Sequence, residues 1–301
     1  MAGPPKDSSR VRLERKGPVA VLTLNSPPVN ILTADLLRDL SHQLTVATAD
    51  PKVRAIVLAS ALEKGFAAGA SIREMATMES READRHGALG QAVTRQIEVC
   101  PLPVVAAVHG ICVGGGTEIA AACDFVIASD DAKFGQPEIN LGVMPGWGGT
   151  QRLPRRLGPQ QAKAWVMLGR SIDARSAYEH GLLWKLVPRP ELLPEAMRLA
   201  SELAQKPPIA LAAAKYALND AIDRGEMHGL AYERRLWSQL FGTPDQREGM
   251  TAFLEKRSPV FWGRDDWSRD SQGFPWAPRI LRRTPAPTLR PRRGRRRKSK
   301  P

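Results

Sequence analysis

The stretch Val113–Ser129, VGGGTEIAAACDFVIAS, decides how the rest of the chain is interpreted. Three consecutive glycines are followed two residues later by Glu118, which then leads an almost wholly apolar run. Burying a lone carboxylate is unfavourable unless a partner or a function requires it. A glutamate near a helix start is most often a capping or dipole partner, and the alternative is a catalytic carboxylate. On this stretch alone both interpretations of Glu118 stay open.

The segments around this stretch alternate between strand and helix signals. Short apolar runs rich in β-branched residues, typical of buried strands, occur at Val19–Leu24, Ala55–Ala59, Val104–Val108 and Phe125–Ala128. Between the first two runs, Thr33–Thr48 carries leucines at helical spacing. Strands that alternate with helices predict an α/β core with buried and largely parallel strands.

Glycine- or alanine-rich turns border these strands, and a second glutamate lies on one of them. The turns are FAAGAS (66–71), VGGGTE (113–118), GQPEI (135–139) and VMPGWGGT (143–150). Glycine lets a backbone approach a ligand closely, and a helix N-terminus offers unpaired N–H donors that suit an oxyanion. Glu118 and Glu138 form a candidate acid–base pair if their surroundings separate their pKa values. The alternative for Glu138 is a turn residue bonded to the backbone.

Taken together, these motifs resemble the enoyl-CoA hydratase/isomerase (crotonase) superfamily. They occur in the family's order between about Val11 and Arg257, as FAAGASI, AAVHGICVGGGTEIAAACDFVIAS, AKFGQPEINLGVMPGWGGTQRLPRRLG and DQREGMTAFLEKR. The resemblance implies an α/β spiral of repeated ββα units over residues 11–191, after an N-terminal extension at 1–10. It also implies a helical region at 192–263 that mediates trimerisation, with a homotrimer or a hexamer of two trimers as the assembly.

The resemblance assigns roles to individual residues. The backbone amides of Ala70 and Gly115 would form an oxyanion hole for a thioester carbonyl, with Glu118 orienting water and Glu138 delivering a proton. The residues expected along the coenzyme A and acyl path are Ala68, Ser71, Ile72, Gly114, Gly146 and Trp147. Many isomerases of the family retain only one of the two glutamates. The presence of both favours an enoyl-CoA hydratase of fatty acid β-oxidation, which adds water to trans-2-enoyl-CoA.

Three positions depart from the pattern expected of short-chain hydratases. Ser71 replaces an aspartate, Asn140 replaces an aliphatic residue, and Trp147 replaces a small residue. An indole at position 147 either shortens the acyl pocket or packs against a neighbouring helix. The alternative enzyme is an enoyl-CoA isomerase, or a superfamily member acting on an aromatic or branched acyl-CoA. No metal or redox cofactor is implied, because coenzyme A belongs to the substrate.

Positive charge is concentrated at the C-terminal end of the chain. Of the formal net charge of +13, residues 279–301 carry nine arginines, two lysines and no acid. The Pro- and Arg-rich segment 264–301 has little apolar periodicity, so we expect it to be disordered. The run RPRRGRRRKSK also suits salt-dependent contacts with phosphates, but it lacks aromatic residues for base stacking. Nucleic-acid binding through this tail is therefore an alternative of a different class.

The cysteines and the apolar pattern bear on the compartment. Cys100, Cys112 and Cys123 show no C-x-x-C spacing, which favours reduced thiols over a zinc site or a disulfide framework. No apolar run approaches the roughly 18 residues of a membrane helix, and MAGPPKDSSR has no apolar segment for secretion. We expect a cytoplasmic protein without membrane contact.

Overall fold

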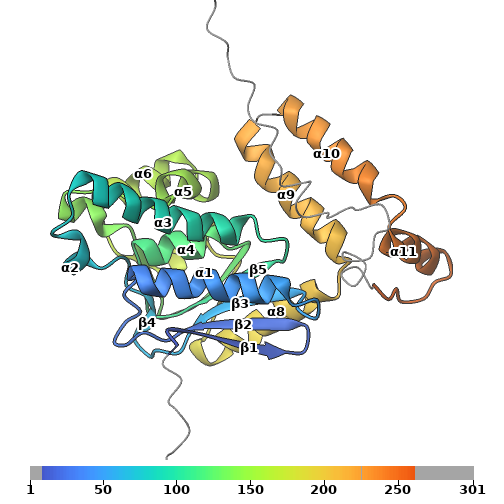
Figure 1. Cartoon of the computed structure of the whole chain (residues 1–301), viewed down its shortest axis with the longest axis horizontal. Coiled ribbons are helices and arrows are strands. Elements are labelled where there is room, and N and C mark those ends of the chain that lie inside the picture. The colour runs from blue at the N-terminus through green and yellow to red at the C-terminus, as the bar shows by residue number, and fades with distance from the viewer. Residues whose placement is uncertain (1–8, 225, 262–301) are drawn as a thin grey trace, which may run out of the picture.

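Two β-sheets form the centre of the molecule in the computed structural model, which describes residues 9–224 and 226–261 (Figure 1). Within these residues, a six-stranded sheet has the order β1-β2-β3-β5-β7-β10 and a four-stranded sheet has the order β4-β6-β8-β9. The strands of the first are β1 (Val11–Lys16), β2 (Val19–Leu24), β3 (Ala55–Ser60), β5 (Val104–Val108), β7 (Phe125–Ser129) and β10 (Lys185–Val187). Those of the second are β4 (Gly65–Ala67), β6 (Ile111–Val113), β8 (Lys133–Gly135) and β9 (Ile172–Asp173). The expectation of a disordered tail over 264–301 concerns residues outside the described ranges.

From β3 to β8, consecutive strands alternate between the two sheets. β3 is followed by β4, β5 by β6 and β7 by β8, and in each case the first strand joins the larger sheet. The three larger-sheet strands pair in parallel, as do β4, β6 and β8. Parallel neighbours need a long crossover, and helical segments supply it after each pair. The predicted α/β spiral of ββα units is confirmed.

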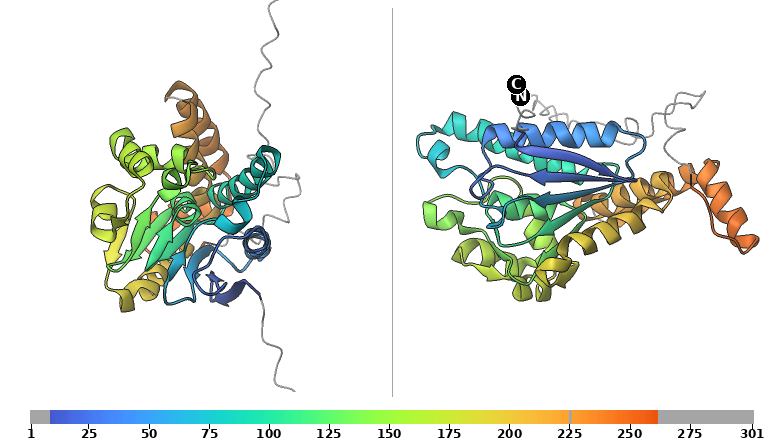
Figure 2. Two further views of the ribbon diagram at one scale, coloured as in Figure 1. Left: turned by 90° about the vertical axis from the view of Figure 1, so that its left-hand side faces the viewer. Right: turned by 90° about the horizontal axis from the view of Figure 1, so that it is seen from below.

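Helices cover both faces of the larger sheet (Figure 2). On one face, Ile56 and Val104 pack under α1 (Ala34–Ala49), α3 (Ser80–Glu98) and α4 (Gly115–Ala122). On the other face, Val57 and Val105 pack against α8 (Leu192–Ala204). Because both faces are buried, neighbouring residues of a strand are all apolar, which explains the continuous runs in the sequence.

The other helical segments lie on the rim of the spiral or beyond it. They are α2 (Ile72–Met75), the 3-10 turn η1 (Pro137–Leu141), α5 (Gly149–Leu157), α6 (Pro159–Leu168), α7 (Ala174–Glu179) and the 3-10 turn η2 (Arg189–Glu191). The last three helices are α9 (Pro208–Arg224), α10 (Glu226–Leu240) and α11 (Pro244–Leu254), here called the helical arm.

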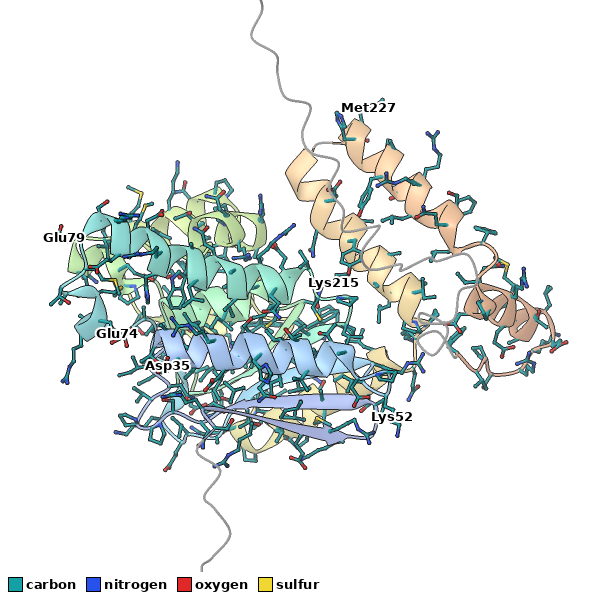
Figure 3. The ribbon with its side chains drawn as sticks, in the orientation of Figure 1. Asp35, Lys52, Glu74, Glu79, Lys215 and Met227 are labelled. Atoms are coloured by element: carbon teal, nitrogen blue, oxygen red, sulfur yellow. The ribbon has the colours of Figure 1, made fainter. Side chains whose placement is uncertain are left out.

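The helical arm projects from the body of the molecule (Figures 1 and 2). Figure 3 shows Met227 at the far end of α10 and Lys215 where α9 passes the body. α9 and α10 pack together through a small apolar cluster that includes Tyr216 and Leu236. α8 lies on the sheet although it begins at Leu192, so the projecting part of the expected oligomerisation region starts at α9. In the part of the chain that the structure describes, no helix combines the length and apolar character needed to cross a bilayer.

Candidate active site

Glu118 lies in the first turn of α4, and the glycines before it explain how the helix reaches its position. Gly114, at the N-cap, has φ 54° and ψ −127°, a conformation that glycine adopts without strain. A Cβ atom on Gly116 would lie 2.4 Å from the carbonyl oxygen of Ala67. The triglycine therefore lets α4 start directly against β4, and Glu118 is only 2% exposed.

The carboxylate of Glu118 binds a loop rather than its own helix. Its Oε1 accepts hydrogen bonds from the backbone amides of Trp147 at 2.8 Å and Gly149 at 2.7 Å. Both amides belong to the turn before α5. Among the described residues, Oε2 of Glu118 accepts no hydrogen bond. Glu118 therefore does not cap α4, and its second carboxylate oxygen has no hydrogen-bond donor among the described residues.

Glu138 lies on η1, the turn that follows β8. A Cβ atom on Gly114 would lie 3.1 Å from Oε1 of Glu138, so this carboxyl group lies beside the start of α4. With its amide nitrogen turned toward the carboxylate, buried Gln136 donates to Oε2 at 3.0 Å and to Oε1 at 2.8 Å. An amide has both a donor and an acceptor, so Gln136 can bind Glu138 in its ionised or its protonated form.

The two glutamates line one cavity of about 310 Å³. The predicted site residues on its wall are Ala68, Ala70, Ile72, Gly114, Gly115, Glu118, Glu138, Gly146 and Trp147. The structure therefore brings together every predicted site residue except Ser71. The Ser71 hydroxyl instead accepts a hydrogen bond from the Glu74 amide at 3.2 Å and caps α2.

The backbone segments that carry Ala70 and Gly115 both line the cavity. Gly115 is the first residue of α4, so its N–H has no acceptor in a preceding turn and lies at the positive end of the helix dipole. The segment that contains Ala70 is held by a bond of 2.8 Å from the Leu32 amide to the Gly69 carbonyl. A Cβ atom on Gly69 would lie 3.5 Å from the Gly115 nitrogen, so the two segments lie side by side.

Comparison with known proteins identifies the family to which this combination of fold and site belongs. The profile of the enoyl-CoA hydratase/isomerase family matches residues 14–264. The chain belongs to the enoyl-CoA hydratase/isomerase family. It is 42% identical over 250 residues to a crotonyl-CoA hydratase from Syntrophomonas wolfei, a match that covers 83% of this chain and 96% of that protein.

Two further relatives agree with this membership. A short-chain-enoyl-CoA hydratase from Clostridium acetobutylicum is 41% identical, again over 83% of this chain and 96% of that protein. The crystal structure of an enoyl-CoA hydratase from Bacillus anthracis superposes with a TM-score of 0.81 at 36% identity, covering 84% of this chain and 99% of that one. The resemblance inferred from the motifs is confirmed.

In this member of the enoyl-CoA hydratase/isomerase family, burial perturbs both glutamates. Burial raises the pKa of Glu118, while the amides of Gly149 and Trp147 and the charge of Arg152 act in the opposite direction. Burial also raises the pKa of Glu138 to about 7, opposed by its own backbone amide and reinforced by the negative charge of Glu118. Two neighbouring carboxyl groups with raised pKa values favour a state in which the pair holds one proton.

Arg152 is a site residue that the sequence interpretation missed. Its Nη1 donates to the carbonyl of Trp147 at 3.0 Å, and its Nη2 pairs with Glu98 at 3.2 Å. Thr94 of α3 donates to the same carbonyl at 2.8 Å. These contacts fix the loop whose amides bind Glu118. The sequence feature that could have indicated this role is the position of Arg152 in the first turn of the helix after PGWGG. From there a long side chain reaches back to the loop.

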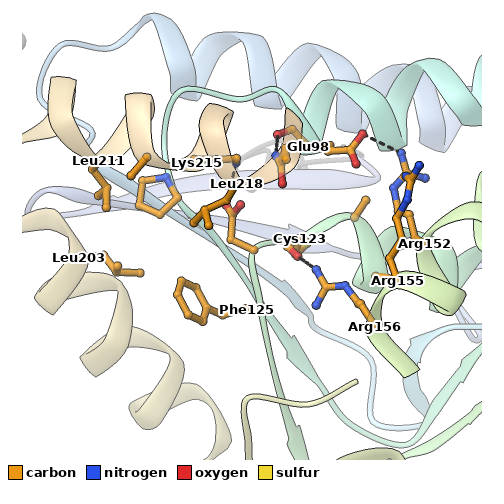
Figure 4. A pocket seen from close by; sticks show the side chains of 16 residues that line it. Glu98, Cys123, Phe125, Arg152, Arg155, Arg156, Leu203, Leu211, Lys215 and Leu218 are labelled. Atoms are coloured by element: carbon orange, nitrogen blue, oxygen red, sulfur yellow. Dashed lines mark hydrogen bonds and ion pairs between the residues drawn. The ribbon is translucent and has the colours of Figure 1, made fainter. Parts of the chain in front are cut away.

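A second cavity of about 430 Å³ lies between the end of α4, α5, α8 and α9 (Figure 4). Its charged side chains are engaged with partners inside the molecule. Lys215 pairs with Asp124 at 2.7 Å, and Arg156 donates to the Cys123 carbonyl. This cavity is larger than the first but lies at the opposite end of α4 from Glu118. The assignment of the active site therefore rests on chemistry rather than on cavity size.

Proposed function

We propose that this chain is an enoyl-CoA hydratase, which adds water reversibly to a trans-2-enoyl-CoA and gives a 3-hydroxyacyl-CoA. The observation that carries the proposal is the pair Glu118 and Glu138, which line one cavity at the N-terminus of α4. The names of the relatives from Syntrophomonas wolfei and Clostridium acetobutylicum support the same reaction.

In the proposed reaction, the thioester carbonyl accepts hydrogen bonds from the amides of Ala70 and Gly115. Negative charge develops on this oxygen as the C2–C3 double bond is attacked, and fixed donors stabilise it without reorganisation. Removing one such donor reduces the rate of comparable enzymes by about 10² to 10³. The helix dipole of α4 acts on the oxygen in the same direction.

The glutamate pair moves the protons. Ionised Glu118 orients water through its second oxygen and takes a proton from it as the water oxygen bonds to C3. Protonated Glu138 delivers its proton to C2, so the C–H and C–O bonds form while one water O–H bond breaks. The proton on Glu118 then returns to Glu138 through solvent, which restores the pair with one proton.

The reaction needs no metal or redox group, because polarisation comes from backbone amides and coenzyme A is part of the substrate. The thiols of Cys100, Cys112 and Cys123 are free and buried, which supports a reducing compartment such as the cytoplasm. We place the activity in the β-oxidation of fatty acyl-CoA thioesters.

We also propose that the helical arm assembles the chain into a homotrimer or a hexamer. Its described side chains include large apolar groups that face solvent in the single chain. Examples are Leu218, Leu230, Trp237, Phe253 and Leu254. Exposed apolar area of this extent favours a partner surface. Size-exclusion chromatography with light scattering measures the molar mass of the assembly and tests the proposal. The mass of a monomer at micromolar concentration would refute it.

An enzyme assay tests the proposed reaction. When purified protein is incubated with crotonyl-CoA, the absorbance of the conjugated enoyl thioester should decrease as 3-hydroxybutyryl-CoA forms. The isomerase alternative predicts instead that a 3-enoyl-CoA is converted to the 2-enoyl-CoA without water addition. A panel that includes branched and aromatic enoyl-CoA thioesters tests the other alternative, an enzyme that acts on a branched or aromatic acyl-CoA. Absence of hydration across the whole panel would overturn the proposed function.

A further inference from the structure

Trp147 is wedged between two glycines at the inner wall of the cavity. A Cβ atom on Gly90 of α3 would lie 2.3 Å from the indole atoms Cδ1, Cδ2 and Cε2. A Cβ atom on Gly115 would lie 2.3 Å from Cζ3 at the other end of the ring. The indole therefore rests directly on two backbones, and only glycine at positions 90 and 115 leaves room for it.

The backbone of Trp147 is fixed on both sides. Its amide donates to Glu118, and its carbonyl accepts from Thr94 at 2.8 Å and from Arg152 at 3.0 Å. Trp147 is 4% exposed and lines the active-site cavity. These contacts make the indole a rigid wall, because neither a backbone shift nor a rotation is open to it without breaking them.

The proposed reaction places the thioester carbonyl at Gly115 and C3 at the water held by Glu118. Trp147 packs on Gly115 and its amide binds Glu118, so in this placement the carbons beyond C3 run toward the indole. The imidazole of His86 lies with its centroid 5.5 Å from the indole and lines the same cavity. Two neighbouring rings therefore line the cavity that contains Glu118.

We infer that Trp147 sets the upper limit of acyl-chain length and restricts the enzyme to short 2-enoyl-CoA thioesters. The inference rests on the proposed hydratase function. A longer chain has to displace a side chain that is packed on two backbones, and forcing extra methylenes into a packed site is unfavourable. A smaller residue at position 147 leaves space along Gly90 for those methylenes.

Kinetics of Trp147→Ala against the wild type test the inference. The values of kcat/KM are measured for crotonyl-, hexenoyl-, octenoyl- and decenoyl-CoA with both proteins. For the wild type, kcat/KM should decline steeply as the acyl chain lengthens. For the variant, the ratio of kcat/KM for octenoyl-CoA to kcat/KM for crotonyl-CoA should be at least tenfold higher than for the wild type. Each methylene newly accommodated should contribute about fourfold. An unchanged ratio, or a shift toward the shorter substrate, would overturn the role of Trp147.

Two controls keep the outcomes distinct. Trp184→Ala removes an indole that is 58% exposed and packs on Phe125, away from the cavity, and should leave the ratio unchanged. If Trp147→Ala does not fold, the same kinetic comparison is made with Trp147→Phe. The affinities of the wild type and the variant for butyryl-CoA and octanoyl-CoA then give a comparison of chain lengths that does not depend on turnover. Wild-type protein that fails to hydrate crotonyl-CoA refutes the proposed function. An active hydratase whose length ratio does not move refutes only the inference on Trp147.

Discussion

The backbone amide of Trp147 donates a hydrogen bond of 2.8 Å to Oε1 of Glu118. The Gly149 amide binds the same oxygen at 2.7 Å, so the loop before α5 is attached to the buried carboxylate at two points. The residue that forms the cavity wall and the residue proposed to hold water therefore move as one unit. A change in either is expected to affect both catalysis and the shape of the cavity.

Replacing Glu118 separates its structural role from its chemical one. Glu118→Gln keeps a carbonyl oxygen that can accept from both loop amides, whereas Glu118→Ala leaves two buried N–H groups unpaired at about 1–3 kcal/mol each. Both variants should lose hydration activity by about 10² or more, because neither has a base for water. Thermal unfolding should show a clear drop in Tm for Glu118→Ala only. Equal destabilisation by both substitutions would show that the loop does not depend on the accepting oxygen.

Glu138→Gln should abolish turnover while leaving substrate binding intact. The amide cannot deliver a proton to C2, and loss of general acid catalysis reduces rates by about 10² to 10⁴. Because the change preserves size, the Kd for butyryl-CoA should stay within about threefold of the wild type. Glu179→Gln, on an exposed part of α7, is the matched control and should be fully active. Wild-type turnover by Glu138→Gln would remove Glu138 from the mechanism.

The pH dependence of kcat/KM should have an alkaline limb near neutrality. Burial and the charge of Glu118 raise the pKa of Glu138 to about 7, so the proton donor is lost as the pH rises through that value. Hydration and dehydration both start from the state in which Glu118 and Glu138 together hold one proton. The decrease of kcat/KM at alkaline pH should therefore be the same in both directions. Profiles measured with crotonyl-CoA and with 3-hydroxybutyryl-CoA check this. A rate that is flat from pH 6 to pH 9 would contradict the assignment.

The buried strands could be predicted from the sequence because burial on both faces leaves a simple signal. The apolar runs Val19–Leu24 and Val104–Val108 coincide with β2 and β5. The short strands β4 and β6 gave no such signal, since each has three residues and periodicity needs a longer segment. Their pairing is a consequence of the spiral, which the order of the motifs predicted as a whole.

The types and order of the residues predicted which of them form the site. They did not predict the hydrogen bonds that hold the site together. The donors to Glu118 are backbone amides of residues 147 and 149, and backbone groups leave no trace in residue type. The Ser71 hydroxyl caps α2, and its assignment to the substrate path stays a prediction. The pattern Ser71-x-x-Glu74 is a recognisable capping signal, so this placement could have been read from the sequence.

The stability of the fold should also depend on the ionisation of Glu138. The pKa of this carboxyl group is raised in the folded protein to about 7 from its ordinary value of 4.5, so the folded state binds the proton more tightly than the unfolded state. Its contribution to stability is fully present below pH 4.5 and is lost as the pH rises through 7. Glu138→Gln should therefore have a higher Tm than the wild type at pH 8, with the difference vanishing near pH 4.5. A Tm difference that is constant across this range would contradict the raised pKa.

Gly116→Ala should separate the two halves of the proposed oxyanion hole. The new Cβ would lie 2.4 Å from the Ala67 carbonyl oxygen, and because that atom is backbone, the contact is relieved only by moving α4 away from β4. The amides of Gly115 and Ala70 then lose their mutual geometry, so kcat should fall at least tenfold and the Tm should decrease. Gly229→Ala is the matched control, since its nearest neighbour would be the Ala221 Cα at 3.9 Å, and helix propensity favours alanine there by about 1 kcal/mol. Wild-type kcat in a folded Gly116→Ala variant would show that catalysis does not require this close approach of α4 to β4.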